Sequence, residues 1–331
     1  MAKFNVTDSE GNTNFIEADE AYVKENYASY SEVVGAELRV YNTVTGKYEG
    51  IEKIEELSTK SGILKNKKAV TGVSIILIFI LTAVIRPLFT HDPNAFIGTP
   101  LSSPSYKHWL GTNGQGQDVL SQTIVGAQQT LLVGFSTGIL VVIIGALIGA
   151  ISGYYGGRTD DFLSMIINIF LVMPGLPLMV ILASWLPPGP LTLMGVLVLT
   201  GWAWNARVIR SQMLSYRGRD FVSAAIVSGE QNIRIIVIEI MPRMLSLLAS
   251  SFIGASIYAI GAQVGLEFLG LGDVNTITWG TNLYWASNDM ALLTGSWWTF
   301  VPTGLSIAII SFGLTLINFG IDEVTNPRLI S

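Results

Sequence analysis

The chain has 331 residues, of which 50% are hydrophobic and 13% are charged, whereas an average soluble protein carries about 25% charged residues. The apolar residues come in long blocks, which excludes an ordinary soluble enzyme and indicates a membrane protein with several spans. The chain contains no cysteine, which excludes disulfides, thiolate metal sites and cysteine nucleophiles, and its two histidines are too few for a histidine-rich metal site.

Residues 1–60 carry the excess negative charge, with twelve Asp or Glu against six Lys or Arg, in a chain whose net charge is −5. Alternation over Leu38–Tyr41 and a turn signal at Thr45-Gly46 indicate a small β-hairpin. The acidic residues 49–56 are compatible with an added helix, and the region is equally compatible with a disordered acidic tail. We treat residues 1–65 as an N-terminal cytoplasmic extension, partly ordered or disordered, without a cleavable signal peptide because it contains no sufficiently long apolar core.

Apolar blocks along the rest of the chain predict an all-α, polytopic membrane protein with six transmembrane helices. About 20 apolar residues at a rise of 1.5 Å cross a hydrocarbon core of about 30 Å. The blocks are Ala69–Leu88, Thr130–Gly153, Phe162–Trp185, Leu191–Ala206, Met244–Leu266 and Thr299–Gly320. The run Met173–Pro177 interrupts the third block, so we expect a kink there, because prolines are tolerated in membrane helices whose neighbours satisfy the freed carbonyls.

The distribution of basic residues orients these helices. If both termini lie in the cytoplasm, cytoplasmic segments hold seventeen of the 19 Lys and Arg residues, and only Arg86 and Lys107 lie on the outer side. This bias follows the positive-inside rule. It predicts a multi-pass protein of the cell membrane with both termini cytoplasmic.

A basic and only partly apolar segment, Arg207–Pro242, separates the fourth and fifth blocks. Asp220 is a good N-cap and Gly229 a good left-handed stop, which predicts a short helix over about residues 219–229. Two alanines in its middle keep the helix thin, so another backbone can approach closely. Such a helix suits docking to a cytoplasmic partner, although an ordinary basic loop also fits the composition.

The spacing of Ala224, Ala225, Gly229 and Pro242 resembles the EAA loop of ABC importer permeases, a coupling helix that sits in a cleft of the ATPase subunit. The family Glu is Ser223 here, which cannot reach as far toward a capping box with Asp220, and this predicts a weaker helix start. The resemblance implies ATPase coupling for the residues that match or border the motif: Arg219, Asp220, Ser223, Ala224, Ala225, Gly229 and Pro242.

A polar, glycine-rich stretch, His108–Ser121, lies between the first two blocks. By itself it is typical of a hydrogen-bonded surface loop that turns into a helix. It also resembles the H-x-L-G-T-D-x-x-G-R-D-V-L-S-R signature of the peptide/nickel branch of these permeases, with Asn113 and Gln117 replacing the family Asp and Arg. The resemblance implies a contact with the binding protein, or a place at the outer gate, for five residues: Leu110, Gly111, Thr112, Gly116 and Asp118.

Three further signatures occur in family order. Residues 153–157 resemble G-Y-x-G-G, residues 268–280 resemble F-L-G-L-G…W-G, and residues 326–329 resemble the terminal D-P-R-L. Together the resemblances cover about residues 70–331. The chain is identified as a member of the dipeptide/oligopeptide ABC importer permeases, a C-type subunit, with residues 66–331 as a permease domain of the type I importer fold.

Glu267 lies where the fifth block ends, and Gln263 lies one helical turn earlier. Acids inside a membrane are functional candidates, but at the end of a span we expect a solvated interfacial carboxylate. The family carries its acid at the position of Gln263, so this feature is moved or lost here.

The sequence contains no nucleotide-binding loop, because Gly46-Lys47-Tyr48 is its only Gly-Lys pair and does not fit G-x-x-x-x-G-K-[ST]. We therefore expect a transport subunit and not an enzyme, with no catalytic residue, cofactor or metal site of its own. The resemblance implies a second homologous permease, two ATPase subunits that bind ATP and Mg²⁺, and an extracellular or periplasmic peptide-binding protein. No nucleic acid is expected.

The predicted function is movement of oligopeptides or dipeptides into the cell by alternating access. Nickel or another small solute, carried by the same permease branch, is the alternative. An ion-driven secondary transporter calls for inverted repeats and buried charges near the midplane, and we find neither. An intramembrane hydrolase needs an ionisable dyad inside the spans, and none is visible in the sequence.

Overall fold

A computed structural model describes the backbone of residues 2–8, 13–18, 38–42, 47–56, 66–85 and 92–325. These residues fall into two compact units. The first consists of the strands that precede Asn66, and the second is Lys67–Thr325.

Four antiparallel strands make up the first unit, in the order β2-β1-β4-β3. They are β1 (Ala2–Asp8), β2 (Thr13–Ala18), β3 (Leu38–Asn42) and β4 (Lys47–Glu56). The pairing of β3 with β4 confirms the predicted hairpin. The helix considered for residues 49–56 is wrong, because β4 also pairs with β1 and so satisfies its backbone groups in two ladders. The described strands likewise contradict a wholly disordered tail.

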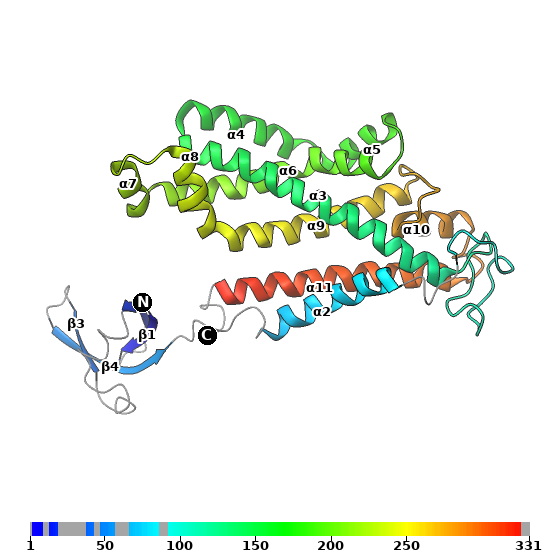
Figure 1. Ribbon diagram of the computed structural model, residues 1–331, viewed down its shortest axis with the longest axis horizontal. Coiled ribbons are helices and arrows are strands. Elements are labelled where there is room, and N and C mark those ends of the chain that lie inside the picture. The colour runs from blue at the N-terminus through cyan, green and yellow to red at the C-terminus, as the bar shows by residue number, and fades with distance from the viewer. Residues whose placement is uncertain are drawn as a thin grey trace. The chain divides into compact units, whose positions relative to one another are not determined.

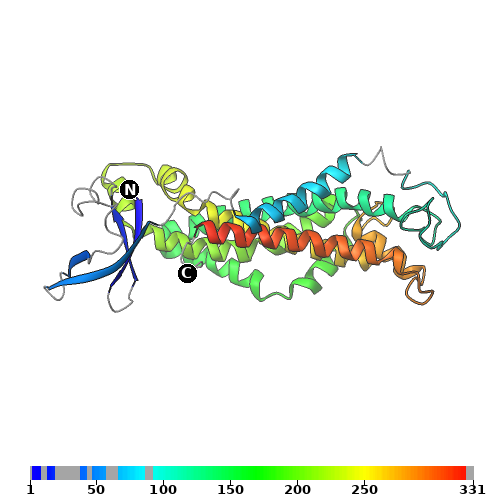
Figure 2. The ribbon, with the colours of Figure 1, turned by 90° about the horizontal axis from the view of Figure 1, so that it is seen from below.

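The second unit is a bundle of helices (Figures 1 and 2). In chain order its elements are α2 (Lys67–Ile85), α3 (Val119–Tyr155), α4 (Gly157–Val172), α5 (Gly175–Trp185), α6 (Pro190–Arg217), α7 (Asp220–Val227), α8 (Asn232–Arg234), the π-helix η3 (Ile235–Ile240), the 3₁₀-helix η4 (Met241–Met244), α9 (Leu245–Phe268), α10 (Trp279–Asn288), the 3₁₀-helix η5 (Trp297–Thr299) and α11 (Val301–Thr325). We call the end of this bundle at residues 92–118 and α10 the loop end, and the opposite end the α7 end (Figure 1).

Helix α3 packs against both α6 and α9 and forms the centre of the bundle. Gly145, Gly149 and Gly153 face α6, and a Cβ at Gly149 would lie only 2.5 Å from the carbonyl oxygen of Ala206. Glycines four residues apart on one face let two membrane helices approach closely. The two helices therefore meet backbone to backbone toward the α7 end.

Helix α3 begins well before the apolar block predicted from Thr130. Its N-cap is Asp118, whose carboxylate accepts the Ser121 N–H at 2.9 Å, so the polar residues that follow are helical as well. Its 37 residues extend over about 55 Å at a rise of 1.5 Å, which is longer than a hydrocarbon core of about 30 Å. Hydropathy found the membrane part of α3 but not its start, because the start depends on a cap.

Four segments of the described part are long and apolar enough to cross a membrane: Val119–Tyr155, Pro190–Arg217, Asn232–Phe268 and Trp297–Glu323. Helices α4 and α5 add a fifth if the pair counts as one span. Helix α2 covers the first predicted block as far as Ile85, the rest of that block lies outside the described residues, and α2 runs along α11 in both views (Figures 1 and 2). The predominantly helical membrane fold is confirmed, and the full number of six spans stays a prediction.

The predicted interruption of the third block is confirmed, and it is a break with a bend of 85° between α4 and α5. Pro174 occupies the N-cap position of α5 and has no N–H with which to continue the ladder of α4. Near the start of α4, the Asp160 carboxylate accepts from the Arg210 guanidinium of α6, with 2.6 Å between Oδ2 and Nη2, and also from the Ser152 hydroxyl of α3. The α7 end of α4 is thereby fixed to two neighbours.

Candidate functional site

The structure confirms the predicted short helix, α7, and its stop. Gly229 has φ +79°, its N–H donates to the Ile226 carbonyl at 3.0 Å, and the Glu230 N–H donates to the Ala225 carbonyl at 3.1 Å. These two bonds form a Schellman motif, the usual glycine-dependent helix end. The predicted start is wrong by one residue, because Arg219 holds the N-cap position without a side-chain bond and Asp220 is the first helical residue.

This shift removes the capping box proposed for position 223. A capping box pairs the N-cap with the third helical residue, and with Arg219 as the N-cap that residue is Val222, not Ser223. Asp220 instead lies in the first turn, where a carboxylate interacts favourably with the helix dipole. A Glu at position 223 therefore has no Asp220 cap to complete.

Helix α7 has one face against its own chain and one face exposed. Val222 is fully buried, and Phe221 and Ala225 pack on the same apolar cluster as Ile209 of α6 and Ile235 of η3. The Arg243 guanidinium carbon lies 4.1 Å from the centre of the Phe221 ring, which adds a cation–π contact.

The exposed face of α7 consists of Ser223, Ala224, Ile226 and Val227, and Val227 is 88% exposed. The sequence assigned both alanines to a partner groove, but only Ala224 faces outward. Ala225 is half-buried against the chain's own core. Pro242 lies in the first turn of η4, where its missing N–H is not needed.

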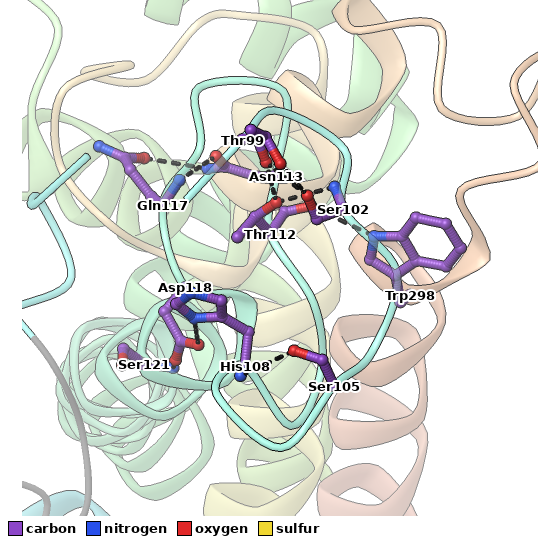
Figure 3. A network of polar contacts seen from close by, with 10 residues as sticks. All are labelled: Thr99, Ser102, Ser105, His108, Thr112, Asn113, Gln117, Asp118, Ser121 and Trp298. Carbon is purple, nitrogen blue, oxygen red and sulfur yellow. Dashed lines mark hydrogen bonds and ion pairs between the residues drawn. The ribbon is translucent and has the colours of Figure 1, made fainter. Parts of the chain in front are cut away.

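At the loop end, the predicted gate residues hold the loop together (Figure 3). The Thr112 hydroxyl donates to the Thr99 carbonyl at 2.6 Å and accepts the Ser102 N–H at 2.9 Å. Asp118 caps α3, pairs with Thr112 in an isolated β-bridge and lies 3.2 Å from His108 Nδ1. The side-chain bonding of Thr112 and Asp118 is therefore directed into the loop itself.

The two glycines of this loop allow close approaches of the backbone. Gly111 has φ +68°, and a Cβ on it would lie 2.4 Å from the Ser102 carbonyl oxygen. Gly116 has φ +76°, and its Cβ would lie 2.4 Å from the Gly98 carbonyl oxygen. Both residues are buried, and Leu110 is half-buried. The most exposed large hydrophobic side chains of the loop are Phe96, Tyr106 and Trp109, which sequence reasoning missed.

Uncharged amides replace the charged residues of the family signature. The Asn113 Oδ1 accepts the N–H groups of Gln115 and Gln117 at 3.0 and 2.9 Å, and its Nδ2 donates to Gln117 Oε1 at 2.9 Å. Gln122 Nε2 donates to the same Gln117 oxygen at 3.0 Å. The two side chains that depart from the family signature thus form a hydrogen bond with each other.

Two carboxyl groups outside the spans have pKa values that are shifted in opposite directions. Burial raises the pKa of Asp289, although its Oδ2 accepts the Gly114 N–H at 3.1 Å and thereby links this loop to the residues that follow α10. Hydrogen bonds from the Asn275 N–H and the Thr276 hydroxyl lower the pKa of Asp273 in the turn before α10.

A cavity of about 560 Å³ lies between α3, α4, α6 and α9. Its polar lining comes from hydroxyl, amide and aromatic side chains, and none of the described residues that line it is charged. The polar and aromatic lining residues are Thr200, Trp204, Asn205, Ser250, Ser251 and Tyr258. Sequence reasoning missed this cavity, because its lining combines segments far apart in the chain. Elsewhere in the described part, no three His, Asp or Glu side chains gather as metal ligands.

Glu267 is buried, with 3% of its surface exposed, so the predicted solvated interfacial carboxylate is wrong. Its Oε1 accepts from Gln263 Nε2 at 2.9 Å, and its Oε2 accepts from the Thr278 hydroxyl at 2.6 Å. The turn and α10 that follow α9 fold back over the end of that helix and cover the carboxylate.

Residues 145–331 match the family described as the inner membrane component of binding-protein-dependent transport systems. The chain belongs to this family. It is 31% identical over 291 residues to the oligopeptide transport system permease protein OppC of Bacillus subtilis (strain 168), with 86% of this chain and 94% of the relative covered. It is 30% identical over 272 residues to the dipeptide transport system permease protein DppC of the same organism, with 80% and 83% covered.

A third relative of this permease is OppC of Mycobacterium tuberculosis (strain ATCC 25618 / H37Rv), 32% identical over 270 residues, with 80% of this chain and 91% of the relative covered. Among solved structures, the permease resembles a chain of the MetNI methionine ABC transporter in an inward-facing conformation, with a TM-score of 0.51 and 18% identity. That likeness covers 63% of this chain and 96% of the other and concerns the fold alone. The resemblance found in the sequence is confirmed.

The family match places α7, Gly229 and the α6 and α9 walls of the cavity inside the matched part of the permease. The loop at residues 92–118 lies before it. The permease is thus a membrane transport component, with an exposed helix at one end, a hydrogen-bonded loop at the other and an uncharged cavity between the helices.

Proposed function

We propose that this permease is one of two transmembrane subunits of an ABC importer that moves oligopeptides or dipeptides into the cell. The relatives named above are oligopeptide and dipeptide transport system permease proteins, and each aligns with 80% or more of this chain. The observation that carries the proposal within the structure is the cavity. Its hydroxyl, amide and aromatic lining suits the uncharged backbone of a peptide. It includes no fixed charge that would repel the amino terminus or the carboxyl terminus of a peptide.

The remaining parts of the importer are a second homologous permease, two ATPase subunits and an extracellular or periplasmic peptide-binding protein. ATP and Mg²⁺ bind to the ATPase subunits, and this chain contributes no catalytic residue, cofactor or metal ligand. The exposed face of α7 meets an ATPase subunit, and the half-buried face connects α7 to α6 and η3. Closure of the ATPase pair then moves the bundle, which opens alternately to the two sides of the membrane.

At the loop end, the strongly exposed hydrophobic side chains of Phe96, Tyr106 and Trp109 meet the binding protein. Gly111, Gly116, Thr112 and Asp118 act on this contact by holding the loop in shape. The signature residues therefore act through the shape of the loop and do not contact the binding protein directly.

The proposed topology has six spans with both termini in the cytoplasm. In the described part of the bundle, the Lys and Arg residues concentrate in the α7 half, and Lys107 lies in the loop. The positive-inside rule then places the α7 end in the cytoplasm. Because the chain contains no cysteine, Ser228→Cys and Ser103→Cys are clean reporters. In intact cells an impermeant maleimide labels position 103 and not position 228, and the reverse pattern refutes this topology.

The function is tested by uptake into vesicles that contain the complete complex, with the cognate binding protein outside and ATP inside. A mixture of short peptides and Ni²⁺ are offered separately. ATP-dependent accumulation of peptide is the expected result. Accumulation of Ni²⁺ without peptide overturns the peptide assignment in favour of the alternative.

The cavity is tested in the same vesicles with Gly254→Leu. Gly254 lines the cavity, and a Cβ there meets nothing within 4 Å, so a side chain can begin at this position without a clash of its first atom. Gly304→Leu in α11 is the matched control, because Gly304 is equally open and does not line the cavity. We expect the first variant to block uptake and the second to leave it unchanged.

A further inference from the structure

Glu267 is a buried carboxylate without a cationic partner. Residues 267–298 contain no Lys or Arg, and none of the ion pairs formed by the described residues includes Glu267. An unpaired buried charge is costly, so its retention in a membrane protein calls for a compensating interaction.

The compensation comes from the N-terminus of α10. The Thr278 hydroxyl, which belongs to the N-cap of α10, donates to the Glu267 carboxylate at 2.6 Å, and Gly280 in the first turn of α10 lies beside the same oxygen. The first amides of a helix lack partners within the helix and carry its positive dipole end. A carboxylate at that point both satisfies a donor and interacts favourably with the dipole.

The neighbouring amides of this turn are satisfied by neutral groups. The Trp279 N–H donates to the Thr130 hydroxyl of α3 at 3.0 Å, and the Thr281 N–H donates to the Thr278 hydroxyl at 3.0 Å. Trp279 is fully buried, and its ring N–H donates to the Thr123 carbonyl at 3.0 Å. Helix α10 is therefore tied to α3 by neutral bonds and to α9 by the hydrogen bond from the Thr278 hydroxyl to the Glu267 carboxyl group.

Two glycines leave just enough room for the carboxylate. A Cβ at Gly280 would lie 2.4 Å from Glu267 Oε2, and a Cβ at Gly272 would lie 2.8 Å from Glu267 Cγ. Both belong to the F-L-G-L-G…W-G signature, so part of that signature forms a cage around this side chain. Gln263, fully buried one turn earlier, closes the cage with its 2.9 Å bond to Glu267.

We infer that Glu267 is a positioning residue whose negative charge holds α10 against the end of α9, and that the cage requires one carboxylate, at position 267 or at position 263. The side chains of Gln263 and Glu267 occupy one cage. The family acid at position 263 has been replaced by an acid one helical turn later, at position 267, and the carboxyl group therefore lies in the same place in space. Seated in this way, α10 keeps the loop end of the permease in the shape that transport needs. The transport part of this inference rests on the proposed function, and the seating of α10 does not.

The test uses a cysteine reporter on α10 in the full chain, embedded in lipid nanodiscs. Ala286 is 5% exposed and Ser287 is exposed. A cysteine at position 286 is therefore labelled by a maleimide only when α10 lifts, and a cysteine at position 287 reports the labelling rate of an open site. Neither measurement needs ATP, peptide or partner chains.

Glu267→Gln removes the charge and keeps the size and the acceptor oxygen of the side chain. We expect position 286 to be labelled about tenfold faster in this variant, which corresponds to about 1.4 kcal/mol. The double variant Gln263→Glu with Glu267→Gln restores one carboxylate and returns labelling to the parental rate. Gln263→Glu alone places two carboxyl groups in one cage and labels faster than the parent, because like charges at that distance repel. Position 287 is labelled equally in all four.

Equal labelling of position 286 in the parent and in Glu267→Gln overturns the inference, because hydrogen bonding without charge then suffices to seat α10. Failure of the double variant to restore slow labelling overturns the shared cage. Uptake by the same variants in vesicles is expected to follow the labelling, with loss in Glu267→Gln and recovery in the double variant. If the parent imports no peptide, the proposed function fails while the labelling still decides the role of Glu267.

Discussion

Replacing Gly229 with Val tests the end of α7 separately from any side-chain contact. Gly229 has φ +79°, and a Cβ there meets nothing within 4 Å, so the cost of a side chain arises in the backbone alone. A left-handed conformation costs an L-residue roughly 1–2 kcal/mol, and a β-branched residue suits it least. Gly218 is the matched control, because it is equally open but has φ −83°, which other residues adopt readily.

The expected loss of ATPase binding in Gly229→Val follows from this conformational cost. A penalty of 1–2 kcal/mol lowers the ratio of native to non-native ends of α7 by a factor of about 5–30. A partner that binds only the native form then has an apparent Kd that is weaker by at most the same factor. A substitution at an unstrained exposed site changes free energies by about 0.5 kcal/mol or less, so Gly218→Val is expected to stay within about twofold of the parent.

The assay titrates the purified ATPase subunits onto the permease in nanodiscs, followed by transport-coupled ATP hydrolysis in vesicles. Gel filtration of each variant confirms that the membrane part is intact. Weaker binding and lower coupled hydrolysis are expected for Gly229→Val only. If both valine variants bind as the parent does, the end of α7 is not part of the ATPase contact, and the assignment of this segment as a coupling helix is refuted.

The other predictions concern side chains. Ala224→Glu is expected to weaken ATPase binding at an unchanged Tm, whereas Ala225→Glu lowers the Tm as well, because Ala225 packs on the chain's own core; equal Tm values contradict the two faces assigned to α7. Asp118→Ala removes the N-cap of α3, at a cost of about 0.5–2 kcal/mol, and Asp118→Asn, itself a good cap, recovers most of the Tm; a parental Tm in the alanine variant contradicts the cap. For Asp289, with its raised pKa, stability is greatest below the unfolded pKa of about 3.9 and declines as the pH rises through the folded value. Asp289→Asn therefore flattens this decline in a plot of Tm against pH. Asp273, with its lowered pKa, contributes stability above the unfolded pKa that is lost as the pH falls, so Asp273→Asn weakens the acid-side drop in Tm instead. Unchanged pH profiles in these two variants contradict the two shifts.

Local sequence signals predicted those features that depend on neighbouring residues. The apolar blocks found the four segments of the described part that are long and apolar enough to cross a membrane, and a fifth if α4 and α5 count as one span, because hydrophobic length is a property of each segment alone. Gly229 predicted the stop of α7, because a left-handed residue is required at that point and glycine adopts it without steric cost. The prolines at residues 174 and 177 predicted the break in the third block, since proline cannot extend the hydrogen-bond ladder of the preceding helix.

The N-cap of α7 was predicted one residue too late, because the side chain of Asp220 is the better cap and Arg219 holds this position without a side-chain bond. The choice between them depends on how the linker from α6 enters α7. The half-burial of Ala225 likewise comes from Ile209 and Ile235, which lie in other elements. Sequence patterns therefore located α7 but did not assign its faces.

The sequence by itself determined that this protein has several membrane spans and where its apolar blocks and α7 lie, because hydropathy, charge bias and turn chemistry act within a few residues. Only the tertiary structure decided where Glu267 lies. Its burial requires Thr278 and Gly280 to fold back over α9, and no property of residues near Glu267 specifies that return. The same holds for β4, whose strand form depends on pairing with β1 across about forty residues of intervening chain, because ladder hydrogen bonds with distant partners outweigh local preference.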